Sequence, residues 1–109
     1  MAATYFGADS ENGEHIDGPS EDALFELIGA LNDSDNTFVV IEPDEDDPSW
    51  FASVAVVEEG GYEIVRRDAA HREHKVHTDT DIGRIALDLT IWLAARNFPR
   101  RPTRPFTDF

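Results

Sequence analysis

Residues 38–65 read FVVIEPDEDDPSWFASVAVVEEGGYEIV. The stretch contains two apolar runs, residues 38–41 and residues 50–57, which are rich in β-branched side chains and predict two strands. The adjacent Gly60 and Gly61 predict a tight turn, after which the chain returns as a third strand over residues 62–65. Because apolar residues fill almost every position, we expect the strand at 38–41 to be buried on both faces and the strand at 50–57 to lie centrally.

An amphipathic helix is predicted on each side of this stretch. The first covers residues 21–32, with Ser20 as its N-cap and acidic residues in its first turn. The second follows residues 78–81, which resemble a capping box with Thr78 as the N-cap and Asp81 as the reciprocal carboxylate. Apolar residues at helical spacing support both helices: Leu24, Leu27, Ile28 and Leu31 in the first, and Ile82, Ile85, Ala86, Leu89, Trp92 and Leu93 in the second.

The remaining segments complete a single α+β domain over residues 1–97. Residues 3–6 predict a short first strand, residues 7–19 a loop, and residues 72–78 a polar edge strand. The order β-α-β-β-β-β-α favours a mostly antiparallel sheet of four or five strands with both helices on one face. The first two strands, joined through a helix, are able to pair in parallel. Residues 98–109 predict a Pro- and Arg-rich tail, either extended or docked on the domain.

Charge is distributed very unevenly along the chain. The net charge is −14, and residues 1–60 contain 8 Asp and 8 Glu without one Lys or Arg. Residues 61–109 contain 7 acidic and 9 basic residues. Such a field repels nucleic acid and anionic membranes and attracts basic proteins, so we expect no nucleic-acid or membrane partner. Acidity that serves only solubility is the alternative explanation, and composition does not separate the two.

Composition also bears on the compartment and on catalysis. The chain has no cysteine, and no apolar stretch reaches the length of about 20 residues that spans a bilayer, so we expect a soluble, cytoplasmic protein. No nucleophile motif or phosphate-binding loop is present, and we expect neither an enzyme nor a bound cofactor. His71, His74 and His77 lack the spacing of a zinc site. Successive side chains of a strand point to opposite faces, so His74 points away from His77, and only His71 and His77 share a face.

The acidic loop at residues 42–47 is the best-defined candidate site. Its carboxylates do not follow the spacing of a calcium-binding loop, which argues against a metal. A loop of this charge is suited to entering a basic cleft on another protein. The predicted partner-binding residues are the four acids of the loop, with two nearby aromatic residues as anchors: Asp44, Glu45, Asp46, Asp47, Trp50 and Tyr62. Packing in the core is the competing role for Trp50.

Residues 19–98 share a series of architectural features with one known family. The features are Pro19-Ser20 before the first helix, the strands at 37–41 and 50–57, the Gly60-Gly61-Tyr62 turn, and a helix from Asp79 to Ala95 followed by Phe98. In these features the chain resembles the Imm1-type immunity proteins, which are small acidic antidotes to bacterial toxins. The Gly- and Pro-rich segment that such proteins often carry before the last helix is missing here. The resemblance implies a toxin partner, and it transfers no binding residue.

The sequence therefore predicts a non-enzymatic domain that binds a basic protein, with a toxin that acts on nucleic acid as one such partner. From a different class, a housekeeping or regulatory domain whose acidity serves only solubility is the alternative. The two hypotheses differ in what neutralising the loop does, because only a partner-binding loop loses an activity when its charge is removed. The oligomeric state is left open.

Overall fold

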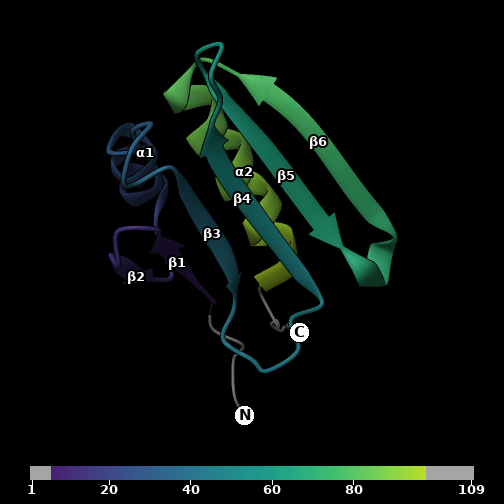
Figure 1. Ribbon diagram of the computed structural model, residues 1–109. Helices are drawn as coiled ribbons and strands as arrows, with labels where there is room; N and C mark the ends of the chain where they lie inside the picture. Colours follow the sequence, from purple (N-terminus) through teal and green to yellow (C-terminus); the bar gives the residue numbers. More distant parts are fainter. Residues whose placement is uncertain (1–5, 98–109) are drawn as a thin grey trace.

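Two helices pack on one face of a six-stranded antiparallel sheet in the computed structural model, which describes residues 6–97 (Figure 1). The sheet order is β2-β1-β3-β4-β5-β6. The elements are β1 (Phe6–Ser10), β2 (His15–Asp17), α1 (Glu21–Gly29), β3 (Phe38–Pro43), β4 (Trp50–Val56), β5 (Tyr62–Asp68), the short 3-10 helix η1 (Ala69–His71), β6 (Glu73–Asp79) and α2 (Ile82–Asn97). The predicted α+β class is confirmed, with six strands in place of four or five.

The N-terminal part of the sheet differs from the prediction. Residues 7–19 are not a loop, because they contain most of β1 and all of β2, paired as an antiparallel hairpin. Residues 3–5 of the predicted first strand lie outside the described residues. The added strand β2 reverses the chain before α1, so β1 pairs with β3 antiparallel. The predicted parallel pairing of the first two strands is therefore wrong.

The core lies between the helices and one face of the sheet. Val39 and Ile41 of β3 are fully buried, as are Ala52 and Val54 of β4. They pack with Ile64 of β5 and with apolar residues of both helices: Leu24, Leu27 and Ile28 of α1, and Ile85, Leu89 and Leu93 of α2. The amphipathic stripes predicted for the two helices thus face the core.

The opposite face of the sheet is the open face, since no helix of the described chain covers it (Figure 1). On β3 the side chains alternate, so Val40 is half-buried and Phe38 is 37 % exposed. The prediction that residues 38–41 are buried on both faces is wrong, because both helices lie on the same side. The central position of β4 and the edge position of β6 are as predicted.

The helix termini agree only in part with the predicted boundaries. The Ser20 Oγ accepts a hydrogen bond from the Ala23 amide at 3.1 Å, which confirms the N-cap of α1. The helix ends at Gly29, before the predicted residue 32, because the side chain of Asn32 organises the following turn. For α2 the cap is Asp81, whose Oδ1 accepts from the Arg84 amide at 3.1 Å. Thr78, the predicted cap, lies in β6.

The predicted tail, residues 98–109, lies outside the described residues. Among the helices of residues 6–97, none combines the length and the apolar character that crossing a membrane requires.

Candidate functional site

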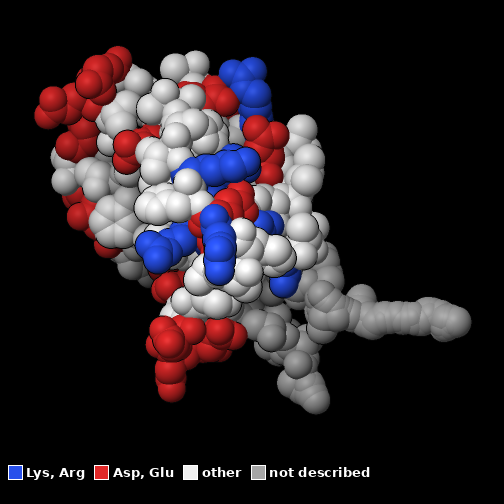
Figure 2. Space-filling model, turned by 90° about the vertical axis from the view of Figure 1, so that its right-hand side faces the viewer, with Lys and Arg blue, Asp and Glu red and all other residues white. Residues whose placement is uncertain are grey.

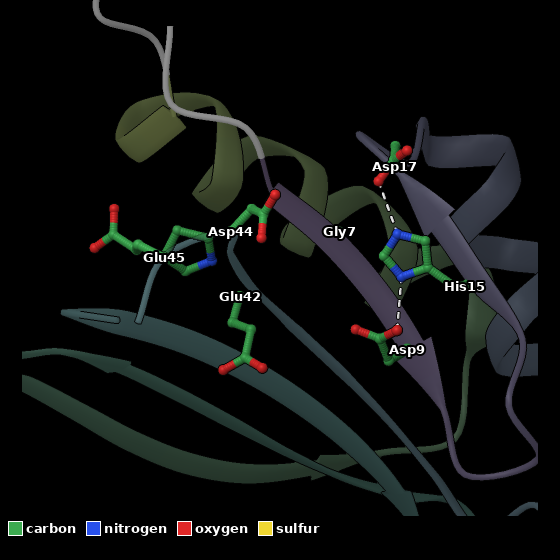
Figure 3. Close-up of a pocket in the computed structure, with 8 residues that line it drawn as sticks. Gly7, Asp9, His15, Asp17, Glu42, Asp44 and Glu45 are labelled. Carbon is green, nitrogen blue, oxygen red and sulfur yellow. Dashed lines mark hydrogen bonds and ion pairs between the residues drawn. The ribbon is translucent and has the colours of Figure 1, made fainter. Parts of the chain in front are cut away.

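An acidic hollow opens on the open face, between the β1–β2 hairpin and the loop after β3 (Figure 3). Its volume is about 220 Å³. Five carboxylates and one imidazole line it, and no Lys or Arg of the described chain is among the lining residues: Gly7, Asp9, His15, Asp17, Glu42, Pro43, Asp44 and Glu45. We call this feature the acidic hollow.

Strand register brings the hollow together from segments far apart in the sequence. Gly7 of β1 lies opposite Asp17 of β2 on one side and opposite Glu42 of β3 on the other. Two residue pairs further along the hairpin, Asp9 lies opposite His15. Because alternate residues of a strand point to the same face, these side chains all reach the open face. The loop after β3 then adds Asp44 and Glu45 at the rim.

His15 bridges two of the carboxylates (Figure 3). Its Nδ1 lies 2.6 Å from Asp9 Oδ1, and its Nε2 lies 2.7 Å from Asp17 Oδ1. A carboxylate only accepts hydrogen bonds, so both ring nitrogens must donate, which requires the protonated imidazolium. The hydrogen bonds to Asp17 and Asp9, together with the charge of Asp9, accordingly raise the pKa of His15 above its ordinary value.

Gly7 forms the floor beneath the imidazole. A Cβ atom at this position would lie 2.7 Å from His15 Cε1, closer than side-chain carbons approach one another. The ring therefore rests directly against bare backbone. A glycine is needed here for the close approach of the ring, not for an unusual backbone conformation.

The structure separates the six predicted site residues. Asp44 and Glu45 line the hollow, whereas Asp46 and Asp47 are exposed in the same loop without lining it. Trp50 is only 7 % exposed and packs edge-on against Trp92, with ring centroids 5.8 Å apart. Tyr62 is half-buried against the core at the far end of β4 and β5. Neither aromatic ring lies at the hollow.

Sequence patterns did not reveal the four residues that the β1–β2 hairpin contributes to the hollow, namely Gly7, Asp9, His15 and Asp17. They fall in the segment predicted as a loop, whose many polar residues concealed the short strands. A usable signal was present in Asn12-Gly13, a dipeptide typical of tight hairpins, and Gly13 adopts a positive φ of 97°. The amide of Gly13 donates to the carbonyl of Ser10 at 2.9 Å and closes the turn.

A second carboxylate–histidine pair lies where β5, η1 and α2 meet. Asp68 is 2 % exposed, and its Oδ2 lies 2.9 Å from His71 Nδ1 and 2.7 Å from Arg96 Nε. Burial raises the pKa of Asp68, but the hydrogen bonds from His71 and the charges of His71 and Arg96 outweigh it, so the pKa is lowered. Arg96 also pairs with Glu73 and lies over the Trp92 ring, with Cζ 3.8 Å from the centroid. These contacts give the cluster a structural role.

The histidines of the β5–β6 region do not converge on one point. His71 is bound to Asp68, while His74 lies opposite Arg67 and His77 lies opposite Ile64, on different faces of β6. Within residues 6–97, no group of three or more His, Asp or Glu side chains is arranged to hold a metal ion.

Basic side chains, with acidic side chains among them, are seen on the side of the molecule that lies to the right in Figure 1 (Figure 2). The six Lys and Arg residues of the described chain all lie between β5 and the end of α2: Arg66, Arg67, Arg72, Lys75, Arg84 and Arg96. Arg67, Arg72 and Lys75 are exposed, and Arg84 pairs with Asp79 at 2.7 Å. The sheet therefore has an acidic end at β1–β2, whereas the four basic and four acidic side chains of residues 62–79 balance one another at the β5–β6 end.

Comparison with known proteins adds no assignment. No protein-family model, no curated protein and no solved structure matches this chain. The resemblance to Imm1-type immunity proteins accordingly stays a prediction.

Proposed function

We propose that this protein is a non-enzymatic binding domain that recognises a basic protein and receives a Lys or Arg side chain in the acidic hollow. The observation that carries the proposal is the charge balance of the hollow, whose lining contains five carboxylates and a single histidine. Even with His15 protonated, the lining keeps four negative charges in excess. Such an excess attracts a cationic group and steers its approach.

The surface beside the hollow suits a protein partner better than a free ion. One row of directly opposed open-face residues runs from the hollow across the sheet: Asp9, Val40, Ser53, Val65 and Val76. Val76 is 53 % exposed, and Phe38 and Phe51 flank this row on the same face. Apolar area beside a charged margin is the usual composition of a protein interface.

A toxin that acts on nucleic acid is the partner class that best fits this surface. An enzyme of that kind carries a basic cleft for phosphate groups, and an acidic protein neutralises it by covering the cleft. An immunity function follows from this chemistry and agrees with the family resemblance. In this proposal Asp44 and Glu45 act at the rim of the hollow, Asp46 and Asp47 extend the charged loop, and Trp50 and Tyr62 are left out as contact residues.

Acidity that serves only solubility is the competing function, and a matched pair of variants separates the two. Asp17→Asn with Asp44→Asn removes two charges from the hollow. Glu58→Gln with Glu59→Gln removes two charges from the exposed turn between β4 and β5, at the other end of these strands. A solubility role predicts that the two double variants behave alike, because the change in net charge is the same.

The experiment is affinity capture from the native host with the wild type and both double variants, washed at low and then at high salt. We expect one stoichiometric basic protein that the wild type and the Glu58/Glu59 variant retain at low salt and release at high salt. The Asp17/Asp44 variant should retain at least about tenfold less, since charges at an interface margin act on association and on its salt dependence. Equal retention by the two double variants would show that the hollow is not the binding site.

A further inference from the structure

His15 holds a position that an incoming cation would need. Its imidazolium donates to Asp9 at 2.6 Å and to Asp17 at 2.7 Å, so these two carboxylates of the hollow already have a positive partner from the chain itself. The ring side chain is 49 % exposed, which leaves it in contact with solvent and free to exchange its proton. We propose, on the basis of the function proposed above, that the hollow takes a guanidinium or ammonium group in exchange for the proton of His15, so that partner binding releases a proton and strengthens as pH rises.

The groups around His15 determine the direction of this coupling. Asp9 from β1 and Asp17 from its own strand β2 contact the ring directly, and Glu42 of β3 and Asp44 and Glu45 of the following loop line the same hollow. All of these groups are acids, and in the free protein Asp17 and Asp9 stabilise the imidazolium. A partner cation in the same hollow interacts with the same carboxylates and repels the imidazolium, so it favours the neutral ring.

The proton balance of the exchange is simple. The imidazolium loses one N–H proton to bulk water, and the neutral ring keeps one N–H, which still donates to one of the two aspartates. The other aspartate is then free to accept hydrogen bonds from the arriving group. Charge is conserved within the hollow, since one cationic group replaces another.

Linkage fixes the size and the pH window of the effect. Release of one proton makes the affinity rise by up to about tenfold per pH unit between the pKa of His15 in the complex and its pKa in the free protein. The free pKa is raised above the ordinary value of 6.5. We therefore expect the affinity to increase through neutral pH and to level off once the free protein has lost the proton.

Hexa-arginine is a suitable probe, because it supplies guanidinium groups without requiring the natural partner. Titration calorimetry near pH 7, in two buffers of different ionisation enthalpy, counts the protons released when the peptide binds the whole chain. We expect the wild type to release a substantial fraction of one proton. His15→Gln should bind the peptide and release almost none, whereas His77→Gln, a control on β6, should behave as the wild type.

NMR titration of the four histidines provides the second measurement. Saturating hexa-arginine should lower the pKa of His15 by clearly more than it lowers that of His74 or His77, which lie on β6 at the opposite edge of the sheet. Equal shifts at the three histidines would mean that the peptide acts only through the general field, and would overturn the exchange. Proton release that persists in His15→Gln would overturn it as well.

Failure of this inference is distinguishable from failure of the proposed function. If hexa-arginine binds, and binding weakens in the double variant Asp17→Asn with Asp44→Asn but no proton is released from the wild type, the hollow is a binding site without the exchange. If that double variant binds hexa-arginine as the wild type does, the hollow is not the site, and both proposals fall together.

Discussion

Residues 6–97 contain two carboxylate–histidine clusters that differ in their surroundings. At the β1–β2 hairpin, His15 joins Asp9 and Asp17 at an exposed surface, and further acids surround the three. At the junction of β5 and α2, His71 joins Asp68, which is 2 % exposed and also pairs with Arg96. One cluster keeps an excess of negative charge in contact with solvent, whereas the other neutralises its charge inside the fold. The difference separates residues available for binding from residues that hold the structure.

The largest expected effect concerns the buried cluster. Replacing Arg96 by Met removes the cation from Asp68 and Glu73 while keeping apolar contact with Trp92. A buried carboxylate left wholly unpaired costs about 3–5 kcal/mol. Because Asp68 keeps its hydrogen bonds from His71, we expect the free energy of unfolding to fall by less than this full cost. Urea denaturation of the whole chain measures it.

Arg84→Met is the matched control for this change. Arg84 pairs with Asp79, but its side chain is 59 % exposed, so solvent screens the pair and we expect a clearly smaller loss of stability than for Arg96→Met. Similar losses for the two variants would show that the contrast between the buried and the exposed cation does not hold.

Gly7→Ala tests the exposed cluster with a smaller expected effect on stability. The new methyl carbon would lie 2.7 Å from His15 Cε1, so it displaces the ring, which is able to swing into solvent. We expect the bridge to Asp9 and Asp17 to weaken and the pKa of His15 to return towards its ordinary value. NMR titration of the imidazole provides the measurement, and an unchanged pKa would show that Gly7 does not position the ring.

The pH dependence of stability is the smallest effect and has opposite signs in the two clusters. The folded pKa of His15 is raised, so its contribution is fully present below the unfolded pKa and is lost as pH rises through the folded value. The folded pKa of Asp68 is lowered, so its contribution is present above the unfolded pKa and is lost as pH falls through the folded value.

Denaturation curves of the wild type and of His15→Gln between about pH 6 and pH 9 isolate the first contribution. We expect the stability advantage of the wild type over the variant to shrink as pH rises across this range. An advantage that stays constant or grows with pH would contradict the assignment of His15 as an imidazolium in the folded protein.

The sequence predicted the parts of the fold that depend on local patterns. The helical spacing of Leu24, Leu27 and Ile28 placed α1, and Gly60-Gly61 placed the β4–β5 turn, because both signals lie within a few residues. The strands β1 and β2 were not predicted as a hairpin, since their open-face positions carry Asp9, His15 and Asp17 in place of apolar residues. Both strands are also short, so their inward positions give too few apolar residues for an alternating pattern to stand out.

For a related reason, only Asp44 and Glu45 of the residues that line the hollow were predicted as site residues. The loop acids are consecutive in the sequence, so their density at Asp44 and Glu45 is visible without a structure. The meeting of Asp17, Gly7 and Glu42 depends on the register of three strands, which no local pattern encodes. Trp50 was ambiguous because an aromatic residue at the start of a strand suits a core and an interface equally well.

The most direct test of the central claim, that the acidic hollow is the binding site for a basic group, is an NMR map of the amide shifts that hexa-arginine produces in the whole chain. We expect the largest shifts on the strand residues that line the hollow: Gly7, Asp9, His15, Asp17 and Glu42. The loop residues at its rim, Asp44 and Glu45, should show the next largest shifts. Shifts of equal size at the exposed acids of the other end, such as Glu58 and Glu59, would show that the peptide follows net charge alone and would contradict this claim.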